Sequence, residues 1–146
     1  MRARNAIDHS DSPKSLKKCD LKELRPFQLE ELLIHAAYQY RDKCVRFLLT
    51  EYELNINSIC YQSTLLIITA WQGNVNLLKW ILKFKGSELD FSFKGVLLQS
   101  SACGGKGPYS ALEWAERKAA ACPLNTSFID CVNLIRKDMN SRLSKN

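Results

Sequence analysis

The sequence predicts an all-helical protein, a solenoid of about three stacked helical hairpins joined by short, β-hairpin-like fingers. Its 146 residues are 46% hydrophobic and 25% charged, which suits one domain with a core of its own. Apolar residues recur at helical spacing along most of the chain. Residues 35–57 also align with residues 69–90 at an offset of 33, a period typical of repeat proteins.

The first expected hairpin covers residues 27–59. Pro26 is suited to open a helix over residues 27–38, because its fixed φ favours the first helical position. A second helix is expected over residues 42–51, where apolar side chains form one stripe.

The second expected hairpin covers residues 60–93. A compact apolar helix over residues 64–71 is followed by Gly73, which suits the left-handed or tight geometry of a turn. An amphipathic helix over residues 75–84 then ends near Gly86. The connectors at residues 54–59 and 89–93 alternate or branch like short strands, so we expect extended fingers there.

The two hairpins repeat in both their apolar and their polar faces. The apolar pairs are Ala37 and Ala70, Val45 and Leu78, and Leu48 and Ile81; the polar pairs are Lys43 and Asn76, Arg46 and Lys79, and Thr50 and Lys83.

A third, irregular hairpin is expected over residues 106–137. Its first helix begins at Ser110, Pro123 lies between its helices, and Asn125 or Thr126 can cap a second helix over residues 128–137. About thirteen extra residues precede it, so residues 91–108 form an inserted finger, within which residues 96–98 are expected to pack back onto the body.

Two short helices and a hairpin-like connector every 33 residues resemble the ankyrin repeat. The residues that carry the resemblance lie where that family has Thr-Pro-Leu-His-x-Ala-Ala, Gly-His and Val-Val-x-Leu-Leu; they are Thr64, Leu66, Thr69, Ala70, Gly73, Asn74, Leu77, Leu78, Ile81 and Leu82. Leu65 and Ile67 depart from the pattern at its proline and histidine. A tetratricopeptide-like solenoid is the alternative, but its period is 34 and it has no finger.

The ankyrin resemblance implies protein binding on a concave surface formed by the fingers and the first helices. The variable exposed positions of that family fall here mainly on aromatic, basic and amide side chains, and also on Cys60. Tyr, Trp and Arg side chains dominate interface energetics. We therefore expect a protein partner of acidic character to contact Tyr38, Gln39, Tyr61, Ser63, Trp71, Gln72, Lys106, Tyr109, Arg117 and Lys118. Trp80 and Trp114 fall on apolar stripes and are expected in the core, and His35 is expected to be a helix-packing histidine.

The charge of +6 is concentrated at the two ends of the chain. Residues 1–26 and residues 132–146 each carry a net +3, whereas residues 27–131 are neutral. We expect a basic, poorly ordered leader over residues 1–26, a repeat domain over residues 27–137 and a basic tail over residues 138–146. The alternative function is a tether, in which the basic ends bind a membrane surface or nucleic acid.

Enzymatic chemistry has little support in the sequence. The six cysteines have no Cys-x-x-Cys spacing, and His9 and His35 lie far from any cysteine cluster, so we expect free thiols, no metal and no cofactor. Lys106 follows two glycines but precedes Gly107 rather than Ser or Thr, which disfavours a phosphate loop. A small enzyme remains the least favoured alternative.

No apolar run is long enough to span a membrane, and no apolar stretch follows the basic start as in a secretory signal. We expect an intracellular, cytoplasmic monomer, with the nucleus or delivery into a host cell left open.

Overall fold

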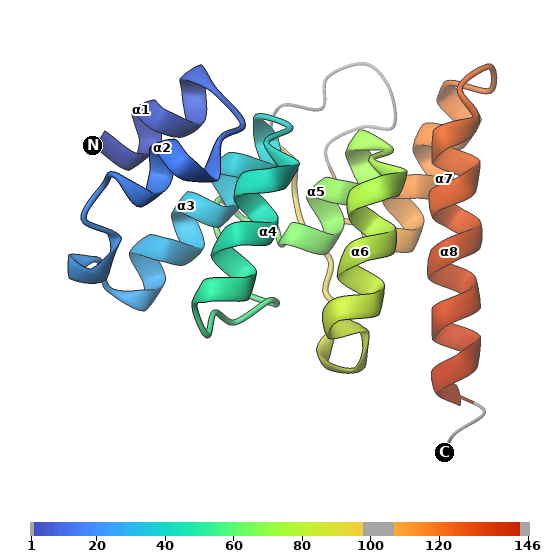
Figure 1. Ribbon diagram of the computed structural model, residues 1–146. Coiled ribbons are helices and arrows are strands. Elements are labelled where there is room, and N and C mark those ends of the chain that lie inside the picture. The colour runs from blue at the N-terminus through green and yellow to red at the C-terminus, as the bar shows by residue number, and fades with distance from the viewer. Residues whose placement is uncertain (1, 98–106, 144–146) are drawn as a thin grey trace. The chain divides into compact units, whose positions relative to one another are not determined.

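The computed structural model describes residues 2–97 and 107–143, and the chain divides into two compact units, residues 1–60 and 61–146 (Figure 1). The described part is mostly helical with almost no strand, as the sequence predicts. The α-helices are α1 (Arg2–His9), α2 (Pro13–Lys17), α3 (Pro26–Tyr38), α4 (Asp42–Glu51), α5 (Leu65–Gln72), α6 (Val75–Lys85), α7 (Ala111–Ala121) and α8 (Thr126–Leu143); η1 (Leu21–Glu23) and η2 (Gly86–Glu88) are short 3₁₀ turns. Among these described helices, none combines the length and apolar character needed to cross a membrane.

The leader is helical and packed, which corrects the expectation that residues 1–26 are poorly ordered. In the first unit α1 packs on α3 and α2 packs on α4, so the leader forms a hairpin stacked on the next one. Ile7 and Leu16 have no exposed surface, and Ala3 and Leu21 are almost as deeply buried. Burying these side chains stabilises the leader against α3 and α4.

Polar contacts also fix the leader to the hairpin. The Asp8 carboxylate lies 2.6 Å from Nε2 of His35, so His35 is a satisfied packing histidine as expected. The guanidinium of Arg41 donates to the carbonyls of Ile7 and Asp8 at 2.8 and 2.9 Å, at the end of α1. These carbonyls are among those that a helix end leaves without an internal partner.

The 33-residue repeat recurs in the backbone geometry of the two units. After α3, Tyr40 has a φ of 59°, and after α5, Gly73 has a φ of 68°. In the first unit Tyr40 N donates to Ala37 O and Arg41 N to Ala36 O; in the second, Gly73 N donates to Ala70 O and Asn74 N to Thr69 O. In both places the α-helix ends at a residue with left-handed φ, and two amides bond the last carbonyls of the helix. We call this a left-handed helix ending; the same local structure therefore occurs twice, 33 residues apart.

Within the second unit, α5 packs on α7 and α6 packs on α8 (Figure 1). The buried side chains of this core include Leu66, Ile68, Leu77, Leu78, Ile81, Trp114, Cys131 and Ile135. The helices begin at defined caps: Thr64 and Asn74 accept from backbone amides three residues on, and Ser110 and Glu113 form a reciprocal capping box. Trp114 is fully buried as predicted. Trp80 is only half-buried and stacks on Phe84 with 4.6 Å between ring centroids, which corrects its assignment to the core.

The predicted extended fingers are turns in the structure. In residues 54–59 the Glu30 carboxylate accepts from Asn55 N at 2.7 Å and from Ser58 Oγ at 3.0 Å. In residues 89–93 the Asp90 carboxylate accepts from Ser92 N at 2.9 Å, which forms an Asx turn. Backbone groups that a partner strand would pair are bonded to these carboxylates instead, so the strand expectation is wrong at both places.

The last helix extends beyond its predicted end. Asn125 accepts from Ser127 N at 3.0 Å and caps α8, as one of the two expected alternatives. The helix then continues to Leu143, through most of the predicted basic tail. Arg142 holds this end, because it lies 3.3 Å from Asp138 and donates to Leu89 O at 2.7 Å.

Candidate functional site

A surface of aromatic rings and cations forms where α5 packs on α7 in the second unit. We define this ring–cation surface by Trp71, Tyr109, Arg117 and Lys118, together with the buried Phe128 ring next to Lys118. The first four were predicted as partner-binding residues from the sequence. The sequence places Phe128 only in a helix, and no local signal shows that its ring lies beside the same lysine as Trp71.

Each cation of this surface lies over aromatic rings. The Lys118 ammonium is 5.5 Å from the centroid of Trp71 and 5.1 Å from that of Phe128. The Arg117 guanidinium is 4.0 Å from the centroid of Tyr109. Cation–π attraction at these distances favours one position for each long side chain.

The rings are themselves held by the core. Tyr109 meets the buried Trp114 edge-on, with 5.0 Å between centroids. Phe128 packs against Gly73, where an added Cβ would lie 2.8 Å from the ring. The left-handed glycine therefore serves both the turn and the close approach of the Phe128 ring.

Among the described residues, no carboxylate forms an ion pair with the two cations of this surface. Over residues 2–97 and 107–143, the ion pairs involve neither Arg117 nor Lys118. The neighbouring acids on α7 are engaged elsewhere: Glu113 pairs with Lys94 at 3.4 Å, and Glu116 pairs with Arg136 at 2.8 Å. The surface is therefore positive as well as aromatic.

The other predicted site residues lie in several environments. Gln72 is half-buried beside Trp71 on α5, and Tyr61, 53% exposed with a φ of 53°, lies in the turn before that helix. Tyr38 and Gln39 end α3 in the first unit, and burial raises the pKa of the Tyr38 hydroxyl. Lys106 lies outside the described residues.

Ser63 is fully buried, so its expected exposure is wrong. The reason is the segment that follows the second hairpin. Val96 N donates to Gln62 O at 2.9 Å, and an added Cβ at Gly95 would lie 3.2 Å from Ser63 Cα. This segment crosses the turn and covers Ser63.

An antiparallel bridge between Gly95 and Tyr109 closes the base of the inserted finger. Gly95 O accepts from Tyr109 N and from Trp114 Nε1, both at 3.1 Å. Of residues 96–98, which are expected to pack back onto the body, Leu97 is fully buried and Val96 is half-buried, and Leu98 lies outside the described residues. The bridge thereby positions Tyr109 for its contact with Arg117.

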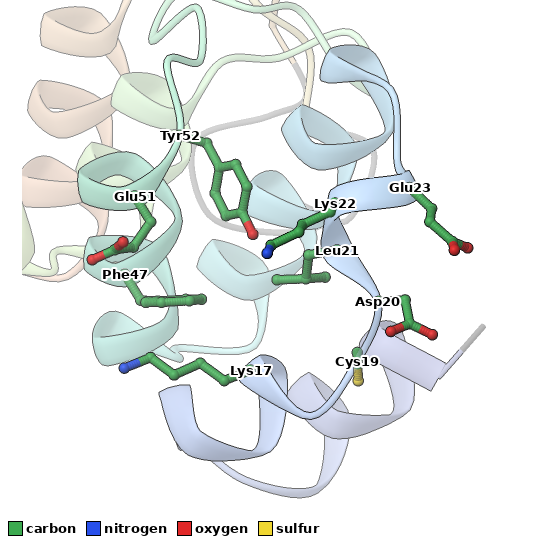
Figure 2. A pocket seen from close by; sticks show the side chains of 9 residues that line it. All are labelled: Lys17, Cys19, Asp20, Leu21, Lys22, Glu23, Phe47, Glu51 and Tyr52. Atoms are coloured by element: carbon green, nitrogen blue, oxygen red, sulfur yellow. The ribbon is translucent and has the colours of Figure 1, made fainter.

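A hollow of about 600 Å³ in the first unit lies between the leader and the second half of α4 (Figure 2). Phe47 and Tyr52 form an aromatic wall, edge to face at 6.5 Å, and the Lys17 ammonium lies 5.4 Å from the Phe47 centroid. Sequence reasoning missed this hollow, because it assigned residues 1–26 to a poorly ordered leader. Its lining is completed by Cys19, Asp20, Leu21, Lys22, Glu23 and Glu51. Two lysines and three acids are among the lining residues, so side chains of both charges surround the hollow.

The thiols of the described residues are free and mostly buried. Burial raises the pKa of Cys44 and of Cys131 to about 12 and also raises that of Cys60. A nucleophilic cysteine needs the opposite shift. Within the described part of the chain, no group of three or more His, Cys, Asp or Glu side chains is placed to hold a metal ion.

No family model, curated protein or solved structure matches this chain.

Proposed function

We propose that this chain is a non-enzymatic protein-interaction module built from ankyrin-like helical hairpins. The proposal is supported by the left-handed helix ending that recurs after 33 residues. It is also supported by the packing within each unit, where first helices contact first helices and second helices contact second helices. This is the arrangement of a helical repeat array, whose rigidity comes from contacts between neighbours.

The observation that carries the proposed function is the ring–cation surface. Aromatic and Arg side chains are enriched in interface hot spots. Here the rings already restrict Arg117 and Lys118, so a partner carboxylate would meet cations that lose little further entropy on binding. The partner we propose is therefore an acidic protein surface that carries an apolar or aromatic group for Trp71.

The decisive variant removes charge without removing packing. Arg117→Gln with Lys118→Gln keeps much of each side-chain stem beside the rings and removes both cations. Lys14→Gln with Lys18→Gln is the matched control, because both lysines are exposed on the leader. Each pair lowers the net charge by the same amount.

Proteins captured from a lysate by the wild type are identified, and the dissociation constant of each is measured with the three forms of the chain. We expect the Arg117/Lys118 variant to raise the dissociation constant of a specific partner by about tenfold or more, and the Lys14/Lys18 variant to leave it unchanged. Equal affinities for all three forms would refute the ring–cation surface.

The same experiment separates the tether function from the module. A tether through the basic leader predicts that the Lys14/Lys18 variant loses binding and that the Arg117/Lys118 variant keeps it. Capture of nucleic acid or anionic vesicles, with that pattern of losses, would replace the proposed function with the tether.

A further inference from the structure

A second positive surface lies on the side of the second unit where α6 and α8 pack together. Two adjoining hollows, of about 320 and about 290 Å³, share Lys79, Leu134 and Lys137 among their lining residues. Because they share these residues, they form one continuous groove between the two helices. Figure 1 shows α6 and α8 running side by side.

The floor of the groove is apolar. Val75 and Leu82 from α6 and Leu134 from α8 line it, and each is half-buried. Val75, Lys79 and Leu82 recur at helical spacing, so they share one side of α6. From Val75 to Lys83 this side runs about 12 Å, at a rise of about 1.5 Å per residue.

The rim of the groove is basic. Lys79, Lys83 and Lys137 are exposed, and over residues 2–97 and 107–143 they take no part in an ion pair. Two acids also line the groove. Asp138 is paired with Arg142 at 3.3 Å, so only Asp130, near the start of α8, offsets the lysines.

We propose that this groove binds an amphipathic helix of a partner protein, with apolar residues along one stripe and Glu or Asp on both flanks. The apolar stripe fills the floor, and the acidic flanks meet the lysines of the rim. A helix is favoured over an extended segment because anchors at i, i+3, i+4 and i+7 match a straight groove of two to three turns. This surface is separate from the ring–cation surface and does not depend on it.

The test uses the full chain, ¹⁵N-labelled, and a synthetic helical peptide with leucines at i, i+3, i+4 and i+7 and glutamates on its flanks. We expect saturable shifts in the amides of residues 75–83 and 130–141, weakened by added salt. A second peptide with every Glu replaced by Gln should bind about tenfold more weakly.

The protein variant is Lys79→Glu with Lys137→Glu, and the charge-matched control is Lys14→Glu with Lys18→Glu. We expect the groove variant to bind the acidic peptide with about tenfold lower affinity and the control to bind it with unchanged affinity. Both variants change exposed side chains, and circular dichroism checks that both remain folded.

Three results would overturn the proposal. The first is no saturable shift up to about 1 mM peptide, the weak limit of useful affinity. The second is shifts that fall on elements other than α6 and α8, or equal losses in both variants. The third is sedimentation of the chain with phosphatidylserine vesicles, abolished by Lys79→Glu with Lys137→Glu, while the peptide does not bind; the occupant would then be a membrane surface.

Discussion

Asp11 provides a sharp test of how the leader stabilises the first unit. Its carboxylate accepts from Lys43 N at 3.2 Å and from Cys44 N at 3.0 Å, so a residue of the leader caps the N-terminus of α4. These amides belong to the first turn of the helix, where N–H groups have no acceptor inside the helix. Asp11 therefore fulfils the role of an N-cap from a distant point in the sequence.

The expected cost of Asp11→Ala follows from two contributions. Loss of a capping side chain destabilises a helix by about 1 kcal/mol, and loss of a negative charge at a helix N-terminus adds up to about 1 kcal/mol. We expect a decrease of about 2 kcal/mol in the free energy of unfolding. Asp11→Asn keeps one accepting oxygen and loses the charge, so its cost should be about half as large. The buried Ile7 and Leu16 should keep the leader docked in both variants.

Urea denaturation followed by far-ultraviolet circular dichroism measures the change, and tryptophan emission reports the second unit, which contains all three tryptophans. Asp20→Ala is the matched control, because Asp20 precedes η1 without a side-chain capping bond. Amide exchange at Lys43 and Cys44 should accelerate only in the Asp11 variants. Equal unfolding free energies for Asp11→Ala and Asp20→Ala, with unchanged exchange at these amides, would refute the capping role.

Three further predictions concern other parts of the chain. Gly73→Ala should lower the free energy of unfolding by about 2 kcal/mol in a denaturation experiment, since the left-handed φ is unfavourable for Ala and the new Cβ meets the Phe128 ring. Tyr40→Gly, at the equivalent place in the first unit, should raise the free energy of unfolding by about 0.5 kcal/mol. Changes of the same sign in the two variants would contradict the shared helix ending. Between pH 9 and about 12 the folded chain should retain the Cys44 and Cys131 protons that the unfolded chain loses. The urea concentration at the midpoint of unfolding should therefore fall as the pH rises above about 9. A midpoint that does not change with pH would argue against the raised pKa values. Ser110→Ala removes one half of the capping box of α7 and should cost about 1 kcal/mol by the same denaturation assay, and an unchanged midpoint would show that the box contributes nothing.

Helix positions were predicted well where the pattern is local. The expected helix over residues 42–51 has the observed bounds of α4, because its apolar stripe and its polar face alternate within ten residues. Gly73 is expected in a turn of left-handed or tight geometry, and its φ of 68° is left-handed. Tyr40 is not, because the bulky side chain gives no local signal for a positive φ.

The errors lie where distant residues decide the structure. The leader helices are short, and an isolated helix of such length is marginal in water. Their order comes from contacts with α3 and α4 that no local pattern displays, such as Asp8 with His35. Similarly, Ser63 is buried because residues after the second hairpin return to cover it. The candidate site was predicted in part: the cations and two rings were found, but the Phe128 contact arises only from packing.

The neutrality of residues 27–131 conceals an uneven use of charge. Many acids in this part satisfy internal groups: Glu30 bonds the first finger, Asp90 bonds the second, and Glu113 caps α7. Two sets of basic side chains form no ion pair within the described part of the chain: Arg117 and Lys118 beside the rings, and Lys79 and Lys83 along the groove, where Lys137 from the basic end of the chain joins them. Because these carboxylates bind backbone amides or pair with another cation, as Glu113 does with Lys94, they do not neutralise these basic side chains, and positive surfaces remain. Acidic partners are therefore expected on two sides of the second unit.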